Sequence, residues 1–171
     1  MEIIAQVFGI IASILAIVSY QFKRKWQILG LCSAANACSA TNFLLLGNAG
    51  VMVANCYVAA IQCAINAVRD KLGKKEAGIA EKIIAFLVFV VIGLVPYKSL
   101  LDLMPLAATM FFVLSTFQKN EQTIRVIIFF NTAILLVYSW VMGSSVVVGH
   151  AFSLVSIVVS YIRERKASEQ K

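Results

Sequence analysis

The chain of 171 residues is 61% hydrophobic and only 13% charged, whereas a soluble domain is usually about half apolar and about a quarter charged. Its apolar residues form stretches of about 18–20, the length of a helix that crosses roughly 30 Å of hydrocarbon. Seven such stretches leave almost no room for loops, which excludes a soluble domain. The formal net charge of +7 is typical of basic cytoplasmic loops, and no basic patch interleaved with glycine and aromatic residues indicates nucleic-acid binding.

Apolar runs and the breaks between them predict the membrane spans. Glu2 is the only early charge and the basic cluster 23–25 follows the first run, so this run is predicted to be a retained span and not a signal peptide. Glycine-containing turns at 47–50 and 143–145 predict antiparallel neighbours, and the polar tail 164–171 is predicted to fray. The predicted spans are 2–20, 26–46, 49–68, 79–97, 101–118, 123–142 and 145–162.

The positions of the basic residues predict the orientation of these spans. The chain has 15 Lys and Arg residues, and all except Lys98 fall in the segments 21–25, 69–82, 119–125 and the C-terminal tail. Seven spans place these segments on one side, which basic residues mark as cytoplasmic. The N-terminus is therefore expected outside and the C-terminus inside.

An internal repeat is predicted from the breaks between spans. Spans one to three and five to seven share one plan, and both begin outside and end inside, so the halves are parallel and need an extra crossing, 79–97, to join them. This predicts an all-α membrane protein with seven transmembrane helices, as two parallel three-helix repeats joined by a linker helix (3+1+3). The predicted units are 1–70, 71–100, 101–163 and the tail 164–171. A shift of 96 residues pairs Ser19 with Ser115, Ile28 with Ile124, Gly47 with Gly143, Val51 with Val147, Gly9 with Pro105, Ser13 with Thr109, and Asn36 with Thr132.

Three short segments carry a family resemblance: Phe43 to Gly47, Asp102 to Pro105, and the closing run from Gly149 through Phe152 to Arg163. On these segments the chain resembles the bacterial inner-membrane YgjV family. The resemblance implies an inner-membrane location and covers most of the chain. The three-plus-one-plus-three plan also resembles the SWEET, PQ-loop and nicotinamide riboside transporters, which implies movement of a small solute down its gradient.

Polar side chains inside the spans are candidates for a solute path, because a polar group left in hydrocarbon is costly. The clearest set is in span three, where Asn55, Gln62 and Asn66 lie within about 60° of one another around a helix and cover roughly 16 Å of its length. Packing between helices is the alternative role for these residues. The candidate substrate-binding residues are Asn36, Asn55, Gln62, Asn66, Asn131, Thr132, His150 and Ser153.

Two further positions are candidates for a hinge. Gly9 and Pro105 are equivalent in the repeat, and paired weak points at one depth suit alternating access; for Pro105, a place in the first turn of a helix is the alternative. His150 is either a protonatable or ligand-binding group or a hydrogen-bonded structural residue. No acidic residue lies in the middle of a span, which favours facilitated transport over a proton-coupled pump.

The sequence leaves two classes of function open. The first is a transporter for a small polar solute such as a sugar, nucleoside or zwitterion; the second is a receptor-like protein or assembly factor whose polar residues serve packing. An enzyme is not expected, since HExxH, GxSxG and P-loop motifs are absent from the sequence. The cysteines lack CxxC spacing, and neither a metal nor another cofactor is expected. The expected partners are the solute and the lipid bilayer, with a homo-oligomer left open.

Overall fold

The computed structural model describes residues 2–45, 51–74, 77–94, 103–141 and 146–169. Every regular element in these ranges is an α-helix, which confirms the all-helical prediction. Each helix overlaps one predicted span. The helices are α1 (Glu2–Ser19), α2 (Lys25–Leu45), α3 (Val51–Lys71), α4 (Ile79–Leu94), α5 (Leu103–Thr116), α6 (Glu121–Val141) and α7 (Val146–Glu169).

The described helix ends follow from local sequence. Asn120 accepts a bond from the backbone N–H of Gln122 (2.8 Å) and so caps the start of α6. Beyond α3, Gly73 adopts a left-handed φ of 60°, which glycine tolerates without steric cost. The predicted turns at 47–50 and 143–145 lie outside the described residues.

Helix α7 continues well beyond its predicted end, so the prediction of a frayed tail from residue 164 is wrong as far as Glu169. The reason is a tertiary contact that hydrophobicity does not encode. Arg163 donates from Nη1 to Gln21 Oε1 (3.1 Å) and from Nη2 to the Gln21 carbonyl (2.9 Å). These bonds fix the helix where it leaves the apolar stretch.

Four helices, α1, α2, α6 and α7, are long and apolar enough to cross a membrane over their described residues. The apolar helix α5 has 14 described residues and α4 has 16, fewer than the ~20 that a span needs. The segment 95–102 between them lies outside the described residues. The count of seven spans is therefore supported directly for four helices and stays a prediction for α3, α4 and α5.

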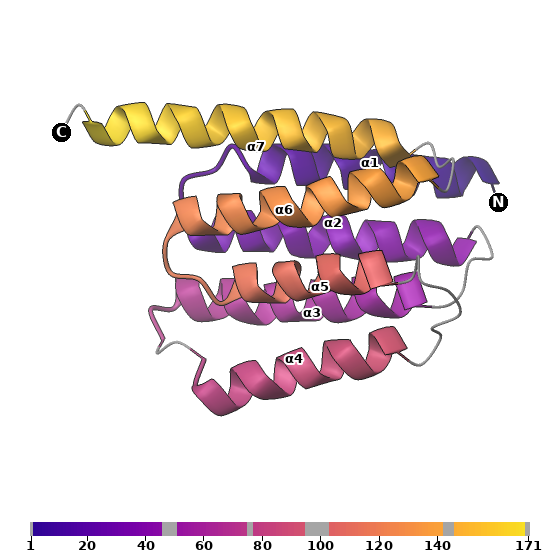
Figure 1. The fold of residues 1–171 in the computed structure, drawn as a ribbon, viewed down its shortest axis with the longest axis horizontal. Coiled ribbons are helices and arrows are strands. Elements are labelled where there is room, and N and C mark those ends of the chain that lie inside the picture. Colours follow the sequence, from indigo (N-terminus) through magenta and orange to yellow (C-terminus); the bar gives the residue numbers. More distant parts are fainter. Residues whose placement is uncertain (1, 46–50, 75–76, 95–102, 142–145, 170–171) are drawn as a thin grey trace.

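We call α1–α3 the first half of the bundle and α5–α7 the second half (Figure 1). In the first half, α2 contacts both α1 and α3; in the second half, α6 contacts both α5 and α7. The halves meet where α1 packs on α7 and α3 on α5, while α4 packs against α3 and α5 at the edge of the bundle. We call the end where α1, α3, α5 and α7 finish the basic end, at the left of Figure 1, and the other the N-terminal end.

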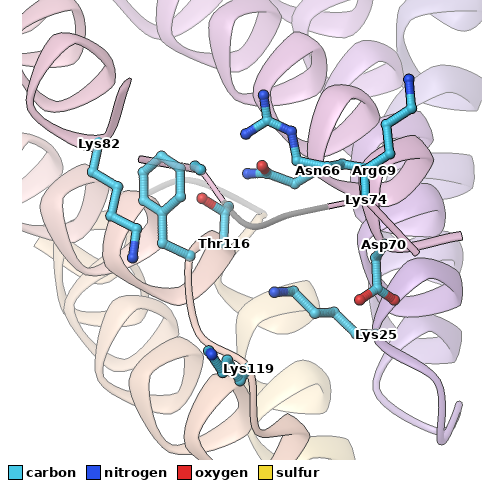
Figure 2. A pocket seen from close by; sticks show the side chains of 10 residues that line it. Lys25, Asn66, Arg69, Asp70, Lys74, Lys82, Thr116 and Lys119 are labelled. Atoms are coloured by element: carbon cyan, nitrogen blue, oxygen red, sulfur yellow. The ribbon is translucent and has the colours of Figure 1, made fainter. Parts of the chain in front are cut away.

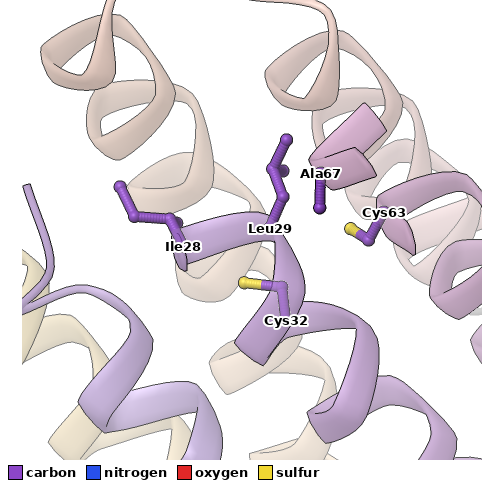
Figure 3. Packing of buried hydrophobic residues seen from close by; sticks show 5 residues of the cluster. All are labelled: Ile28, Leu29, Cys32, Cys63 and Ala67. Atoms are coloured by element: carbon purple, nitrogen blue, oxygen red, sulfur yellow. The ribbon is translucent and has the colours of Figure 1, made fainter. Parts of the chain in front are cut away.

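Apolar clusters fill the bundle near the basic end. One joins α2 to α3 through Ile28, Leu29, Cys32, Cys63 and Ala67 (Figure 3), with Phe22 and Phe112 packed against it. A second unites Tyr20, Ile124, Ile128 and Ile157, and so joins α1 to α6 and α7. A third, of Ala59, Phe89 and Val113, attaches α4 to α3 and α5.

Residues 96 positions apart make matching hydrogen bonds in the two halves. Ser19 Oγ donates to the Ala16 carbonyl (2.7 Å), and Ser115 Oγ donates to the Phe112 carbonyl (2.6 Å). Both serines are fully buried. Three more pairs of bonds match at this shift. The Ser13 hydroxyl donates to the Gly9 carbonyl, and the Thr109 hydroxyl donates to the Pro105 carbonyl. In the backbone, the N–H groups of Phe22 and Ile28 donate to the carbonyls of Ser19 and Arg24, and those of Gln118 and Ile124 donate to the carbonyls of Ser115 and Asn120.

Candidate functional site

A cavity of about 570 Å³ lies between the two halves. Its walls come from α1, α2, α3, α5, α6 and α7, and α4 contributes nothing to its described lining. The lining runs from Gln6 and Val148, near the N-terminal end, to Tyr20, Cys32 and Ile128. The last three belong to the apolar clusters of the basic end, so these clusters form the cavity floor.

Six of the eight candidate substrate-binding residues line this cavity: Asn36, Asn55, Asn131, Thr132, His150 and Ser153. The other two do not. Gln62 is partly buried outside its described lining, and Asn66 lines a separate, smaller cavity at the basic end. The cavity thus brings together candidate residues from α2, α3, α6 and α7. Of the three polar residues of span three, Asn55 lines it, whereas Gln62 and Asn66 lie nearer the basic end.

The amides around the cavity differ in their hydrogen bonds. Asn131 Nδ2 donates to the Ala108 carbonyl of α5 (2.6 Å), and Asn36 Nδ2 donates to the Cys32 carbonyl within α2 (2.8 Å). Asn55 is 7% exposed, and its Oδ1 has no hydrogen-bond partner. A buried carbonyl oxygen without a donor costs about 1–3 kcal/mol, so Asn55, a residue of the cavity lining, holds an unmet acceptor that is itself covered.

The candidate hinge residues also line the cavity, and each has a local structural reason. Pro105 is the third described residue of α5, in the first turn, where a proline removes no helical hydrogen bond. Gly9 lies mid-way along α1, where an added Cβ would be 3.1 Å from Asn42 Nδ2. Close packing of α1 on α2 therefore explains Gly9 without a hinge.

Sequence reasoning missed Asn42, a buried cavity-lining residue whose Nδ2 donates to the Ala5 carbonyl of α1 (2.6 Å). It lies six residues from Asn36, about 120° away around the helix, so the two do not share a face. The signal was present, since an amide inside an apolar run needs a partner. Asn42 meets that need across the α1–α2 interface.

Sequence reasoning also missed the bonds that close the basic end. Gln21 Nε2 donates to Ser156 Oγ (2.7 Å), and Ser156 Oγ donates to the Ile17 carbonyl (2.9 Å). Arg125, counted with the basic turn 119–125, is 1% exposed inside α6 and donates from Nη2 to the Phe22 carbonyl (2.7 Å). Its reading as a loop cation is wrong, because it joins the second half to the end of α1.

The lining of the cavity is largely apolar and uncharged, with polar groups set among apolar side chains. Its described lining contains amides, hydroxyls and one imidazole, His150, with no Asp, Glu, Lys or Arg. Across the described ranges, no three His, Cys, Asp or Glu side chains group to hold a metal ion. Such walls can exchange neutral hydrogen bonds with a ligand.

Four helices long and apolar enough to cross a membrane, around an uncharged cavity, define an integral membrane protein of the α-helical class. The chain belongs to the Imp-YgjV family, described as bacterial inner membrane protein, which it matches over residues 3–168. This confirms the predicted family resemblance and the inner-membrane location. No curated protein and no solved structure matches the chain significantly.

Proposed function

We propose that this protein is a facilitative transporter of a small polar solute that carries no net charge, such as a sugar, a nucleoside or a zwitterion. The observation that carries the proposal is the cavity between the halves, with the unpartnered Asn55 Oδ1 at its wall. Its volume of about 570 Å³ is in the range of small-molecule sites. A hydroxyl or N–H of the solute would satisfy Asn55. The proposal assigns no catalytic residue and no cofactor.

The contacts between helices support alternating access between two parallel repeats, α1–α3 and α5–α7. If the two halves were exchanged, α1 would take the place of α5 and α7 would take the place of α3. The α1–α7 contact would then become the α5–α3 contact, and both contacts are present. The bonds that match at a shift of 96 residues agree with this exchange. Helix α4 lies outside both halves. It fits the role of the linker helix, the one extra crossing that two parallel three-helix repeats need between them.

The closed basic end fits one of the two access states that the proposal requires. If basic residues mark the cytoplasmic side, the N-terminus lies outside and the cavity extends towards the outside. The floor of Tyr20, Cys32 and Ile128 then separates the cavity from the cytoplasm. Under the proposal, the closure at the basic end belongs to a state that is shut towards the cytoplasm, and transport requires that these contacts part.

A second candidate, a membrane protein without transport, is favoured by one observation. Asn42 and Asn131 donate to carbonyls of neighbouring helices, which is how polar residues stabilise packing in membranes. Asn55 distinguishes the candidates, because its acceptor makes no hydrogen bond that would hold two helices together.

The first prediction compares Asn55→Ala with Ser33→Ala. Asn55→Ala removes an unmet acceptor, so thermal stability should stay the same or rise while flux is lost. Ser33 donates to the Ala60 carbonyl across the α2–α3 interface (2.8 Å) and lies outside the cavity lining. Its loss should destabilise the protein by about 1 kcal/mol and leave the flux per folded molecule unchanged.

The measurement is uptake of radiolabelled sugars, nucleosides and amino acids into liposomes that contain the purified protein, with melting curves on the same samples. The panel first identifies a solute that the wild type carries. Absence of flux for the whole panel, or full flux in Asn55→Ala, would favour the packing role and an interaction protein.

A further inference from the structure

A second cavity, of about 130 Å³, lies at the basic end, apart from the central one (Figure 2). Its walls come from the start of α2, the end of α3, the start of α4 and the end of α5 with the turn that follows. It therefore lies where the first half, the second half and α4 meet. Its volume is well above the roughly 10–15 Å³ that one water needs.

The lining of this basic-end cavity has an excess of positive charge. It contains one carboxylate, Asp70, and Glu81 bridges Arg69 from the rim at 2.6 Å. Basic residues at the cytoplasmic side are ordinary topological signals, but here four helix ends bring them around one partly open cavity. The cations are Lys25, Arg69, Lys74, Lys82 and Lys119.

A buried hydrogen-bond donor completes the site. Asn66 lines this cavity, is 6% exposed, and its Nδ2 has no hydrogen-bond partner. Asn66 therefore has a donor without a partner, whereas Asn55 has an acceptor without a partner. An N–H donor surrounded by cations calls for a ligand with negatively charged oxygens.

We propose that the basic-end cavity binds a phosphate-class anion, either the headgroup phosphate of an anionic lipid or a free phosphate group. Asn66 Nδ2 donates to one phosphate oxygen, and Lys74 and Lys82 contribute positive charge beside it. Because the walls include α3 of the first half and α5 of the second, the bound anion also fastens the two halves at the end that is already closed. The site does not depend on transport through the central cavity.

The test measures stabilisation by the anion itself. Purified protein in a neutral detergent is melted with inorganic phosphate or with chloride at equal ionic strength. In a second arm, the protein is melted in nanodiscs of phosphatidylcholine with and without phosphatidylglycerol. Ligand binding to the folded state raises the melting temperature. A rise with phosphate identifies free phosphate as a ligand, and a rise confined to phosphatidylglycerol identifies a lipid headgroup.

Three variants locate the site. Asn66→Leu removes the buried donor, and Lys74→Gln removes an exposed cation of the lining without disturbing the core. Each should weaken apparent binding about tenfold, as expected for loss of one charge-assisted hydrogen bond or ion pair. The control Lys23→Gln removes an exposed cation at the same end but outside the lining and should bind like wild type. No shift in either arm, or equal weakening by Lys23→Gln, would overturn the proposal.

Discussion

The two ends of the helix bundle hold the halves together with different kinds of contact. At the basic end, directional bonds cross between the halves from Arg125 and Arg163 to the backbone of Phe22 and Gln21. Further from that end, α1 and α7 approach through small residues, and a Cβ on Gly149 would lie 3.0 Å from Ser13 Oγ. One end is therefore fixed by bonds with specific partners and the other by close packing. Opening the basic end requires the loss of particular bonds, which mutations can remove one at a time.

The largest loss of stability is expected for Arg125→Met, at the basic end. Removing the guanidinium leaves the Phe22 carbonyl without this donor and loses the link between α6 and the end of α1. The expected destabilisation is about 2–3 kcal/mol, in the range for losing a hydrogen bond made by a charged group. Arg125→Lys keeps the charge and should recover part of it. Reversible unfolding of the purified variants measures this, and unchanged stability in Arg125→Met would show that the bond does not hold the basic end.

A smaller effect is expected for Gln21→Ala, which removes side-chain bonds to Ser156 and Arg163. We expect a loss of about 1–2 kcal/mol. The two thiols that report access are Cys56, in the cavity lining, and Cys63, fully buried in the basic-end cluster. Cys63 should react faster with a small maleimide in Gln21→Ala, while the rate at Cys56 stays close to that of wild type. Peptide mass spectrometry reads each cysteine separately.

The control for Gln21→Ala is Gln118→Ala. Gln118 Nε2 donates to the Leu114 carbonyl of its own segment (3.1 Å) and so joins no two helices. Both labelling rates should match wild type in this variant. Equal acceleration at Cys63 in the two variants would mean that Gln21 has no special part in closing the basic end.

The smallest effect is expected at the close approach of Gly149 to Ser13. Gly149→Ala places a methyl group against Ser13 Oγ, which must shift and weaken its bond to the Gly9 carbonyl. We expect a loss of about 1 kcal/mol. Ser13→Ala removes the obstructing oxygen, so the double variant should lose less than the sum of the single variants. Strict additivity in a double-mutant cycle of unfolding free energies would contradict the contact.

Helix positions could be predicted from sequence because the length of each apolar run decides where a helix can cross hydrocarbon. The end of α7 could not, since Arg163 fixes it by bonding to Gln21, which is 142 residues distant in sequence. Arg125 was misread for a related reason. Its sequence neighbourhood at the start of α6 is basic and polar, and only the packed second half buries it.

The central cavity was predicted in part, because polar side chains inside spans must face other protein groups or water. That argument assigned Asn36, Asn55 and Asn131 to the interior, and these residues line the cavity; whether they bind a solute stays a prediction. Gln62 and Asn66 are also buried or partly buried but lie outside this cavity, because helical spacing fixes the face of α3 and not the depth at which the cavity ends. The apolar cluster containing Cys63 occupies that depth.

The uncharged lining of the central cavity has an electrical consequence. A voltage of 100 mV does work of about 2.3 kcal/mol on each elementary charge that crosses a membrane. The described lining contains no Asp, Glu, Lys or Arg, so a rearrangement of these walls displaces none of those charges through the field. Water in the cavity would concentrate the voltage drop across the closed floor, where Arg125 is the buried cation. A membrane voltage would therefore act on the closure at the basic end and leave the described walls of the central cavity without a direct electrical bias.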